Sequence, residues 1–164
     1  MINSLKLKIG LDYHGVIDKN IDYFFSFCTR AKQRGYLIFI ITGGPKTQVE
    51  YNLKANGIPF DMCFAISDYY QALGKIVFDK DQNLIIPDNL WNIAKADFCR
   101  RSKINIHIDD SSEYLKWFST PYCYYDKKTK KGYIYPKTEF DFNADVDKVL
   151  DKIEQTIINL TGFV

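Results

Sequence analysis

The segment Tyr36–Ile41, with the sequence Tyr-Leu-Ile-Phe-Ile-Ile, is an uninterrupted apolar run. It is bounded by Gly35 on one side and by the residues Thr-Gly-Gly-Pro at positions 42–45 on the other. A run that is apolar at every position is typical of a central strand in a parallel sheet, because helices cover both faces of such a strand. This segment therefore predicts an α/β fold.

Short apolar runs and amphipathic stretches alternate along much of the chain. We expect strands at residues 5–11, 36–41, 62–66 and 104–108, and helices at residues 21–34, 47–55, 90–101 and 111–118. Strands and helices that alternate with short connections predict a three-layer, Rossmann-like parallel sheet with helices on both faces. We expect a single domain over residues 1–164.

Two further units are expected beside this pattern. A small hairpin insertion is predicted at about residues 75–87, around the polar turn Lys-Asp-Gln-Asn at positions 80–83. A C-terminal hairpin is predicted from residues 121–125 and 133–135, with an amphipathic helix at residues 144–160 after it.

The charge balance and the cysteines limit which classes of protein this chain can belong to. The 22 Lys and Arg residues nearly balance 20 Asp and Glu residues, for a net charge of +2, which argues against a dedicated nucleic-acid binder. No signal peptide or membrane-spanning run is visible, so we expect a cytoplasmic protein with no membrane partner. The 4 cysteines show no zinc-site spacing and are expected to be reduced and mostly buried, with one disulfide pair as the alternative.

Polar residues follow several of the expected strands, at the edge where ligands bind in open parallel sheets. They are Asp12, Thr42, Ser67 with Asp68, and Asp109 with Asp110. The carboxylates of Asp12, Asp109 and Asp110 would repel one another unless a cation lay between them. Oxygen ligands of this kind suit Mg²⁺.

An anion site is expected next to these carboxylates. Thr42, Gly43 and Gly44 form a turn that opens a helix, where backbone N–H groups and the helix dipole attract negative charge. Lys95, midway along a later helix, would add a fixed positive charge. A metal, a carboxylate nucleophile, a hydroxyl group and a lysine together predict phosphoryl transfer.

Four motifs carry these residues, in a set order. They are Ile-Gly-Leu-Asp-Tyr-His-Gly-Val-Ile-Asp at 9–18, Phe-Ile-Ile-Thr-Gly-Gly at 39–44, Ile-Ala-Lys-Ala-Asp-Phe-Cys at 93–99, and Ile-His-Ile-Asp-Asp-Ser at 106–111. With them the sequence resembles the haloacid dehalogenase-like superfamily, known mostly for Mg²⁺-dependent phosphatases, over roughly residues 5–125. The resemblance implies a magnesium-dependent phosphohydrolase whose substrate is a small-molecule phosphate ester, with nucleotides among the candidates.

The resemblance also implies a role for each site residue. Asp12 would attack phosphorus and form an aspartyl-phosphate, while Thr42 and Lys95 would hold the phosphoryl oxygens. The Mg²⁺ ligands would be the Asp12 carboxylate, the backbone carbonyl of His14 and a carboxylate of the Asp109-Asp110 pair. Alignment with the family's usual Gly-Asp favours Asp110 as the direct ligand and Asp109 as a partner outside the metal's own ligands.

His14 departs from the family pattern. Phosphatases of this superfamily usually carry a second Asp two residues after the nucleophile, and it protonates the leaving group and activates water. Histidine titrates near neutral pH and is able to do this acid–base work. Two hypotheses follow: an active hydrolase assisted by His14, and a degenerate phosphate- or nucleotide-binding module with little turnover.

Three other polar residues have a structural and a functional interpretation. Asp18 either binds substrate or forms a helix-cap or loop hydrogen bond. For Asp68 we favour a helix cap over a catalytic role, and for His107 we favour packing in the core over a role as ligand or base. The hairpin insertion leaves room only for a minimal cap, so the site should be open to larger phosphates unless oligomerisation closes it. Tyrosines and lysines in the hairpin at 122–135 suggest an alternative as a nucleic-acid-end phosphatase, but a solvated turn is favoured.

Overall fold

The computed structural model describes residues 6–135 and 138–162, so Leu5, at the start of the first expected strand, lies outside the described residues. Within them, a 7-stranded sheet has the order β3-β2-β1-β6-β7-β8-β9. The strands are β1 (Lys8–Leu11), β2 (Leu37–Thr42), β3 (Met62–Ala65), β6 (Ile106–Asp109), β7 (Tyr122–Asp126), β8 (Lys131–Ile134) and β9 (Thr138–Asp141). The first five strands in this order, from β3 through β2, β1 and β6 to β7, pair in parallel. Strand β8 pairs antiparallel with β7, and β9 pairs antiparallel with β8.

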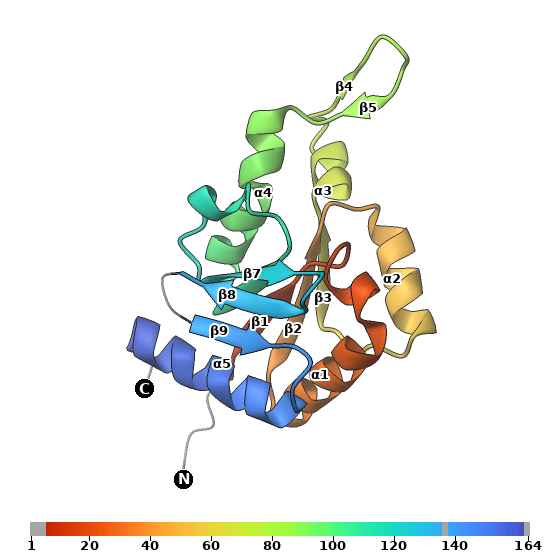
Figure 1. Ribbon diagram of the computed structural model, residues 1–164. Helices are drawn as coiled ribbons and strands as arrows, with labels where there is room; N and C mark the ends of the chain where they lie inside the picture. Colours follow the sequence, from red (N-terminus) through yellow and green to blue (C-terminus); the bar gives the residue numbers. More distant parts are fainter. Residues whose placement is uncertain (1–5, 136–137, 163–164) are drawn as a thin grey trace.

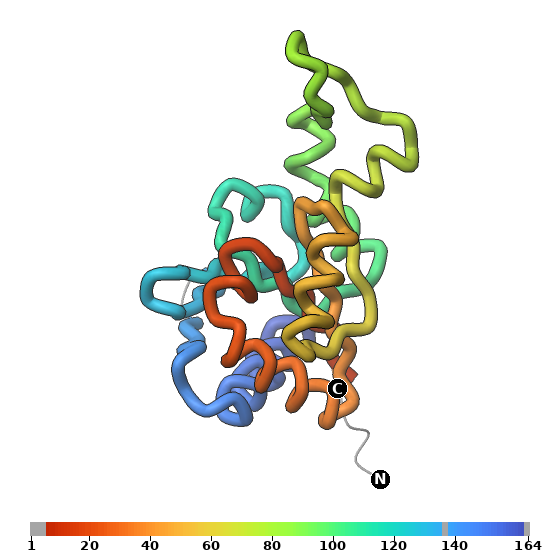
Figure 2. The backbone as a smooth tube through the Cα atoms, turned by 90° about the vertical axis from the view of Figure 1, so that its right-hand side faces the viewer, coloured from red at the N-terminus to blue at the C-terminus, as the bar shows by residue number. Residues whose placement is uncertain are grey.

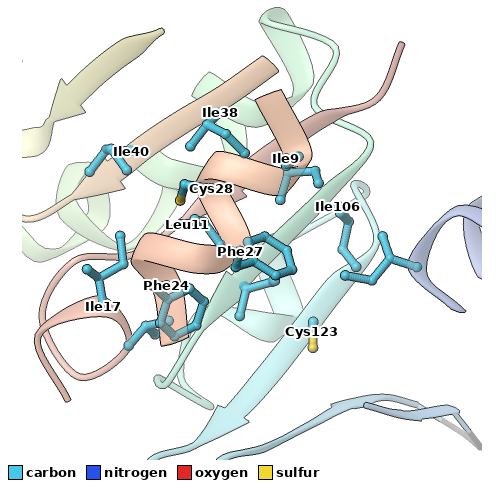
Figure 3. Close-up of a cluster of buried hydrophobic side chains, with 14 of the residues drawn as sticks. Ile9, Leu11, Ile17, Phe24, Phe27, Cys28, Ile38, Ile40, Ile106 and Cys123 are labelled. Atoms are coloured by element: carbon cyan, nitrogen blue, oxygen red, sulfur yellow. The ribbon is translucent and has the colours of Figure 1, made fainter. Parts of the chain in front are cut away.

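Helices cover both faces of this sheet (Figure 1), which makes the fold Rossmann-like and confirms the α/β prediction. One face packs against α1 (Ile21–Gln33), α2 (Lys46–Ala55) and α5 (Val146–Thr161). The other face packs against α3 (Ile66–Ala72) and α4 (Asp88–Arg101). Figure 3 shows Phe24 and Phe27 of α1 against the isoleucines of the sheet.

The alternation of side chains in β1 and β6 decides which residues reach the α4 face. The residues Ile9, Leu11, Ile106 and Ile108 belong to the core on the α1 face. Because successive side chains of a strand point to opposite faces, Asp12 and Asp109 lie on the α4 face. The register pairs Leu11 with Ile108, so these two aspartates follow neighbouring strands at the same level.

The hairpin insertion is confirmed as β4 (Val77–Phe78) paired with β5 (Leu84–Ile85). It projects away from the sheet in both views of the chain (Figures 1 and 2). Its strand residues are all exposed, so the hairpin adds no buried side chains to either core.

The helix expected at residues 111–118 is wrong, because only the 3₁₀ turn η2 (Leu115–Trp117) forms there. Both backbone groups of Ser111 are bonded to side chains outside this segment. The Ser111 N–H donates to Asp109 Oδ1 at 3.0 Å, and the Tyr122 hydroxyl donates to the Ser111 carbonyl. These bonds occupy the backbone of Ser111, and the chain then forms a bend and a turn at residues 112–114 where the first helical turn was expected.

Three elements were not predicted: the 3₁₀ helix η1 (Ile17–Lys19), helix α3 and the edge strand β9. The 4 cysteines are all free and buried, in agreement with the expectation of reduced thiols. Among the helices in the described parts of the chain, none combines the length and apolar character that a membrane span needs.

Candidate active site

Three carboxylates meet at the carboxyl ends of β1 and β6. One oxygen each from Asp12, Asp109 and Asp110 lies within 4.8 Å of the others. The Asp12 N–H donates to the Ile108 carbonyl at 2.9 Å, so the β1–β6 ladder continues to the point where the carboxylates begin. Asp12 and Asp109 are buried and Asp110 is partly exposed. The structure therefore brings together the three aspartates that the strand ends predicted.

Lys95 of α4 reaches into this cluster from the helical layer. Its Nζ lies 2.7 Å from Asp109 Oδ2 and 3.1 Å from Asp12 Oδ2, and its side chain is 4% exposed. Burial alone would lower the pKa of Lys95, but the two carboxylates outweigh burial and raise it above the usual range. The two carboxylates thus favour the charged ammonium form of Lys95, which they share.

Asp109 is held as a carboxylate by several donors. Burial disfavours its charge, yet Lys95 and His107 keep the pKa of Asp109 well below its usual range. Asp109 Oδ2, which accepts a hydrogen bond from Lys95, also lies 3.0 Å from His107 Nε2. The other oxygen, Oδ1, accepts the Ser111 N–H. Both carboxylate oxygens of Asp109 therefore already accept hydrogen bonds from the protein.

Asp12 is in the opposite electrostatic situation. Burial, together with the negative charges of Asp109 and Asp110, raises the pKa of Asp12 above its usual range, although Lys95 partly opposes the shift. Its Oδ1 accepts the N–H of Tyr13 at 2.8 Å. Lys95 carries one positive charge against the two buried carboxylates of Asp12 and Asp109, so an additional cation would favour the ionised form of Asp12.

His107 is confirmed as a core histidine. It is fully buried, and its ring stacks on Phe118 with centroids 5.3 Å apart. Burial lowers the pKa of His107, which favours a neutral ring. With its proton on Nε2, this ring donates to Asp109 and fixes the orientation of that carboxylate.

The loop after Asp12 wraps around Asp110. Gly15 has a φ of +86°, and a Cβ at this position would lie 2.2 Å from Asp110 Oδ2. The Gly15 N–H donates to Asp18 Oδ1 at 2.7 Å, which confirms the expected loop hydrogen bond of Asp18. The His14 side chain is 55% exposed, and its Nδ1 lies 3.6 Å from Asp18 Oδ2.

If the three carboxylates bind a divalent metal, as the sequence predicts, the substitution Gly15→Ala should weaken that binding about 10- to 100-fold, because the new methyl group would displace the Asp110 carboxylate. Gly35→Ala is the matched control, since Gly35 has a φ of +80° but no atom within 4 Å of its would-be Cβ. Both variants should lose about 1–2 kcal/mol of stability from the left-handed backbone. Mn²⁺ titration and urea unfolding measure the two effects, and equal metal affinities in the two variants would contradict the predicted role of Gly15.

Thr42 ends β2 with its hydroxyl buried. Its exposed fraction is zero, and Oγ1 has no hydrogen-bond partner among the described residues. A buried hydroxyl without a partner costs free energy of about 1–3 kcal/mol. An oxygen of a bound ligand would remove this cost, which is consistent with the expected phosphate site.

The turn after Thr42 is shaped by the neighbouring helix α3. Gly44 has a φ of +116°, and a Cβ there would lie 2.0 Å from Ser67 Oγ, so only glycine fits. Asp68 Oδ2 accepts the N–H of Lys46, the first residue of α2, at 2.9 Å. Asp68 therefore caps α2, and one of the backbone donors expected to bind an anion is already used. The backbone of Gly43 belongs to the same turn.

Two aromatic residues that the sequence did not point to border Lys95 and Gly43. Trp91 Nε1 donates to the Tyr114 hydroxyl at 2.8 Å, and Lys95 Nζ lies 5.2 Å from the centre of the Tyr114 ring. A Cβ on Gly43 would lie 3.1 Å from the Trp91 ring. The spacing of four residues between Trp91 and Lys95 on one helix was the available signal, because such residues share a helix face.

The tyrosines of the 122–135 hairpin are divided between the core and the surface, and Tyr124 and Tyr133, which pair across β7 and β8, are partly exposed. Tyr122 and Tyr125 are buried, whereas Tyr135 is 69% exposed. Lys131 pairs with Glu139 across β8 and β9, at 2.9 Å. The two strands of this hairpin, β7 and β8, lie inside the sheet, between β6 and the edge strand β9.

Neither a scan against models of known protein families nor a search of curated proteins finds a match to this chain.

Proposed function

We propose that this chain is a magnesium-dependent phosphohydrolase of the haloacid dehalogenase-like type, which acts on phosphate monoesters through an aspartyl-phosphate on Asp12. The observation that carries the proposal is the cluster of Asp12, Asp109 and Asp110 around the buried Lys95. The unpartnered hydroxyl of Thr42, at the end of β2 and therefore on the strand next to β1, supports it.

The residues present fit a magnesium ion. The cluster offers only oxygen atoms, which Mg²⁺ prefers. Asp109 already accepts bonds from Lys95, His107 and Ser111, so Asp12 and Asp110 would hold the ion, together with the His14 carbonyl that the family resemblance implies. When bound, the ion would supply positive charge to the phosphoryl oxygens and to the acidic cluster.

In the proposed first step, an Asp12 carboxylate oxygen forms a bond to phosphorus while the bond to the leaving oxygen breaks. Lys95 and Thr42 bind phosphoryl oxygens and favour the charge that develops there. His14, protonated, gives its proton to the leaving oxygen. In the second step, water attacks the aspartyl-phosphate, His14 takes a proton from that water, and inorganic phosphate leaves with the Asp12 carboxylate restored.

Metal removal tests this function. Purified protein should release phosphate from an aryl phosphate or a panel of nucleoside monophosphates in Mg²⁺, and EDTA should lower the rate by on the order of 10²- to 10³-fold. Excess Mg²⁺ should restore it. A rate that EDTA leaves unchanged would contradict the metal requirement.

The position of His14 favours a second candidate, a phosphate-binding module with little turnover. Its side chain is more than half exposed and is paired with Asp18 on the loop. Such a module would gain thermal stability from inorganic phosphate in Mg²⁺ and would release no phosphate from any ester of the panel. The same assay therefore separates the two candidates.

A further inference from the structure

Asp110 has a second neighbour outside the catalytic cluster. Lys127 Nζ lies 3.3 Å from Asp110 Oδ2. Lys127 is the first residue after β7, which pairs in parallel with β6 and places Tyr124 beside Asp109. The β7–β8 turn therefore emerges at the same edge of the sheet as the three carboxylates.

The turn that carries Lys127 has a defined backbone. Asp126 Oδ1 accepts the N–H of Lys128 at 2.9 Å, and the Asp126 carbonyl accepts the N–H of Lys130 at 2.7 Å. A pocket of about 270 Å³ lies between this turn and Asp110. Lys127 is thus directed to Asp110 by the fold, and it has open space beside it.

The ion pairs of the cluster show that Asp110 takes its counter-charge from a different lysine than Asp12 and Asp109 do. Lys95 forms its ion pairs with Asp12 and Asp109. Lys127 supplies the cation on the outer side of Asp110. Its side chain is 55% exposed, whereas that of Lys95 is 4% exposed, so Lys127 is able to leave the pair without opening the core.

We propose that Lys127 is a tethered counter-ion that pairs with Asp110 in the metal-free protein and is displaced when a divalent cation binds. The ammonium group and the metal compete for the same carboxylate. This inference rests on the proposed function, because it takes Asp110 as a metal ligand. It assigns to the β7–β8 turn a role in setting the metal affinity of the site.

Binding of Mn²⁺, with the free ion counted by electron paramagnetic resonance, tests the competition without any assay of turnover. Lys127→Met should bind Mn²⁺ about 2- to 5-fold more tightly than the wild type, since an exposed ion pair of modest strength no longer has to be broken. Lys128→Met is the matched control. It removes the same charge from the next residue of the turn, and its Mn²⁺ affinity should equal that of the wild type.

Two results would overturn the proposal. Lys127→Met with wild-type affinity would show that the lysine does not compete, and equal tightening in Lys128→Met would show only a general effect of surface charge. Failure of the proposed function gives a different result: Asp110→Asn would then bind Mn²⁺ as the wild type does.

Discussion

Asp12→Asn is expected to lower the rate of phosphate release by on the order of 10³-fold or more, because an amide does not form the aspartyl-phosphate. The substitution keeps the size of the side chain and removes its negative charge. Burial and the neighbouring acids already disfavour that charge, because they raise the pKa of Asp12. We therefore expect the variant to fold and to unfold at a denaturant concentration no lower than the wild type. Steady-state hydrolysis of an aryl phosphate and urea unfolding measure the two outcomes.

Asp97→Asn is the control for this prediction. Asp97 lies on the same helix as Lys95, but it pairs with Arg100 and Arg101 at the surface. Its activity should match that of the wild type. An acid-quenched, phosphate-labelled protein should be trapped with the wild type and with Asp97→Asn, and not with Asp12→Asn. An Asp12→Asn variant that hydrolyses the ester at the wild-type rate would show that Asp12 is not the nucleophile.

The arrangement of Asp12, Asp109 and Lys95 was predictable because it follows from local patterns. The apolar runs identify parallel strands, parallel strands place their carboxyl ends at one edge, and the helix before β6 packs on the face that those aspartates share. The sequence favoured Asp110 over Asp109 as the direct metal ligand only through the family resemblance, and the packing around Asp109 supports the same choice in the proposed site. The Asp109 carboxylate accepts hydrogen bonds from the His107 ring and from the Ser111 N–H. These bonds depend on side-chain orientations, which the spacing of residues in the sequence does not predict.

The contacts that the sequence did not predict come from segments distant in the chain. The pairing of Lys127 with Asp110 depends on the place of β7 beside β6, and the bond from Trp91 to Tyr114 depends on the path of the loop after β6. Strand β9 escaped prediction because Phe140 is its one buried residue, so its local apolar pattern is too weak. A short edge strand of this kind is defined by its neighbour, β8.

Lys95→Met is expected to lower the free energy of unfolding of the metal-free protein by about 3–5 kcal/mol, because it removes the cation from a buried ion cluster and leaves the carboxylates of Asp12 and Asp109 facing one another. Methionine fills much of the volume of the lysine stem, so the loss is mainly electrostatic. Urea unfolding in EDTA measures it. Lys54→Met, at an exposed position of α2, is the control and should change stability by less than about 0.5 kcal/mol.

The same variant also tests whether charge or packing is lost. If the cluster holds a divalent cation, Mg²⁺ should stabilise Lys95→Met more than it stabilises the wild type, because the ion then faces carboxylates that no ammonium neutralises. Phosphate release should stay low even in Mg²⁺, since the variant lacks the ammonium group that is proposed to bind the phosphoryl oxygens. A Lys95→Met protein as stable as Lys54→Met in EDTA would mean that the two buried aspartates do not depend on Lys95. A large loss that Mg²⁺ leaves untouched would mean that the defect is one of packing and that the metal binds elsewhere.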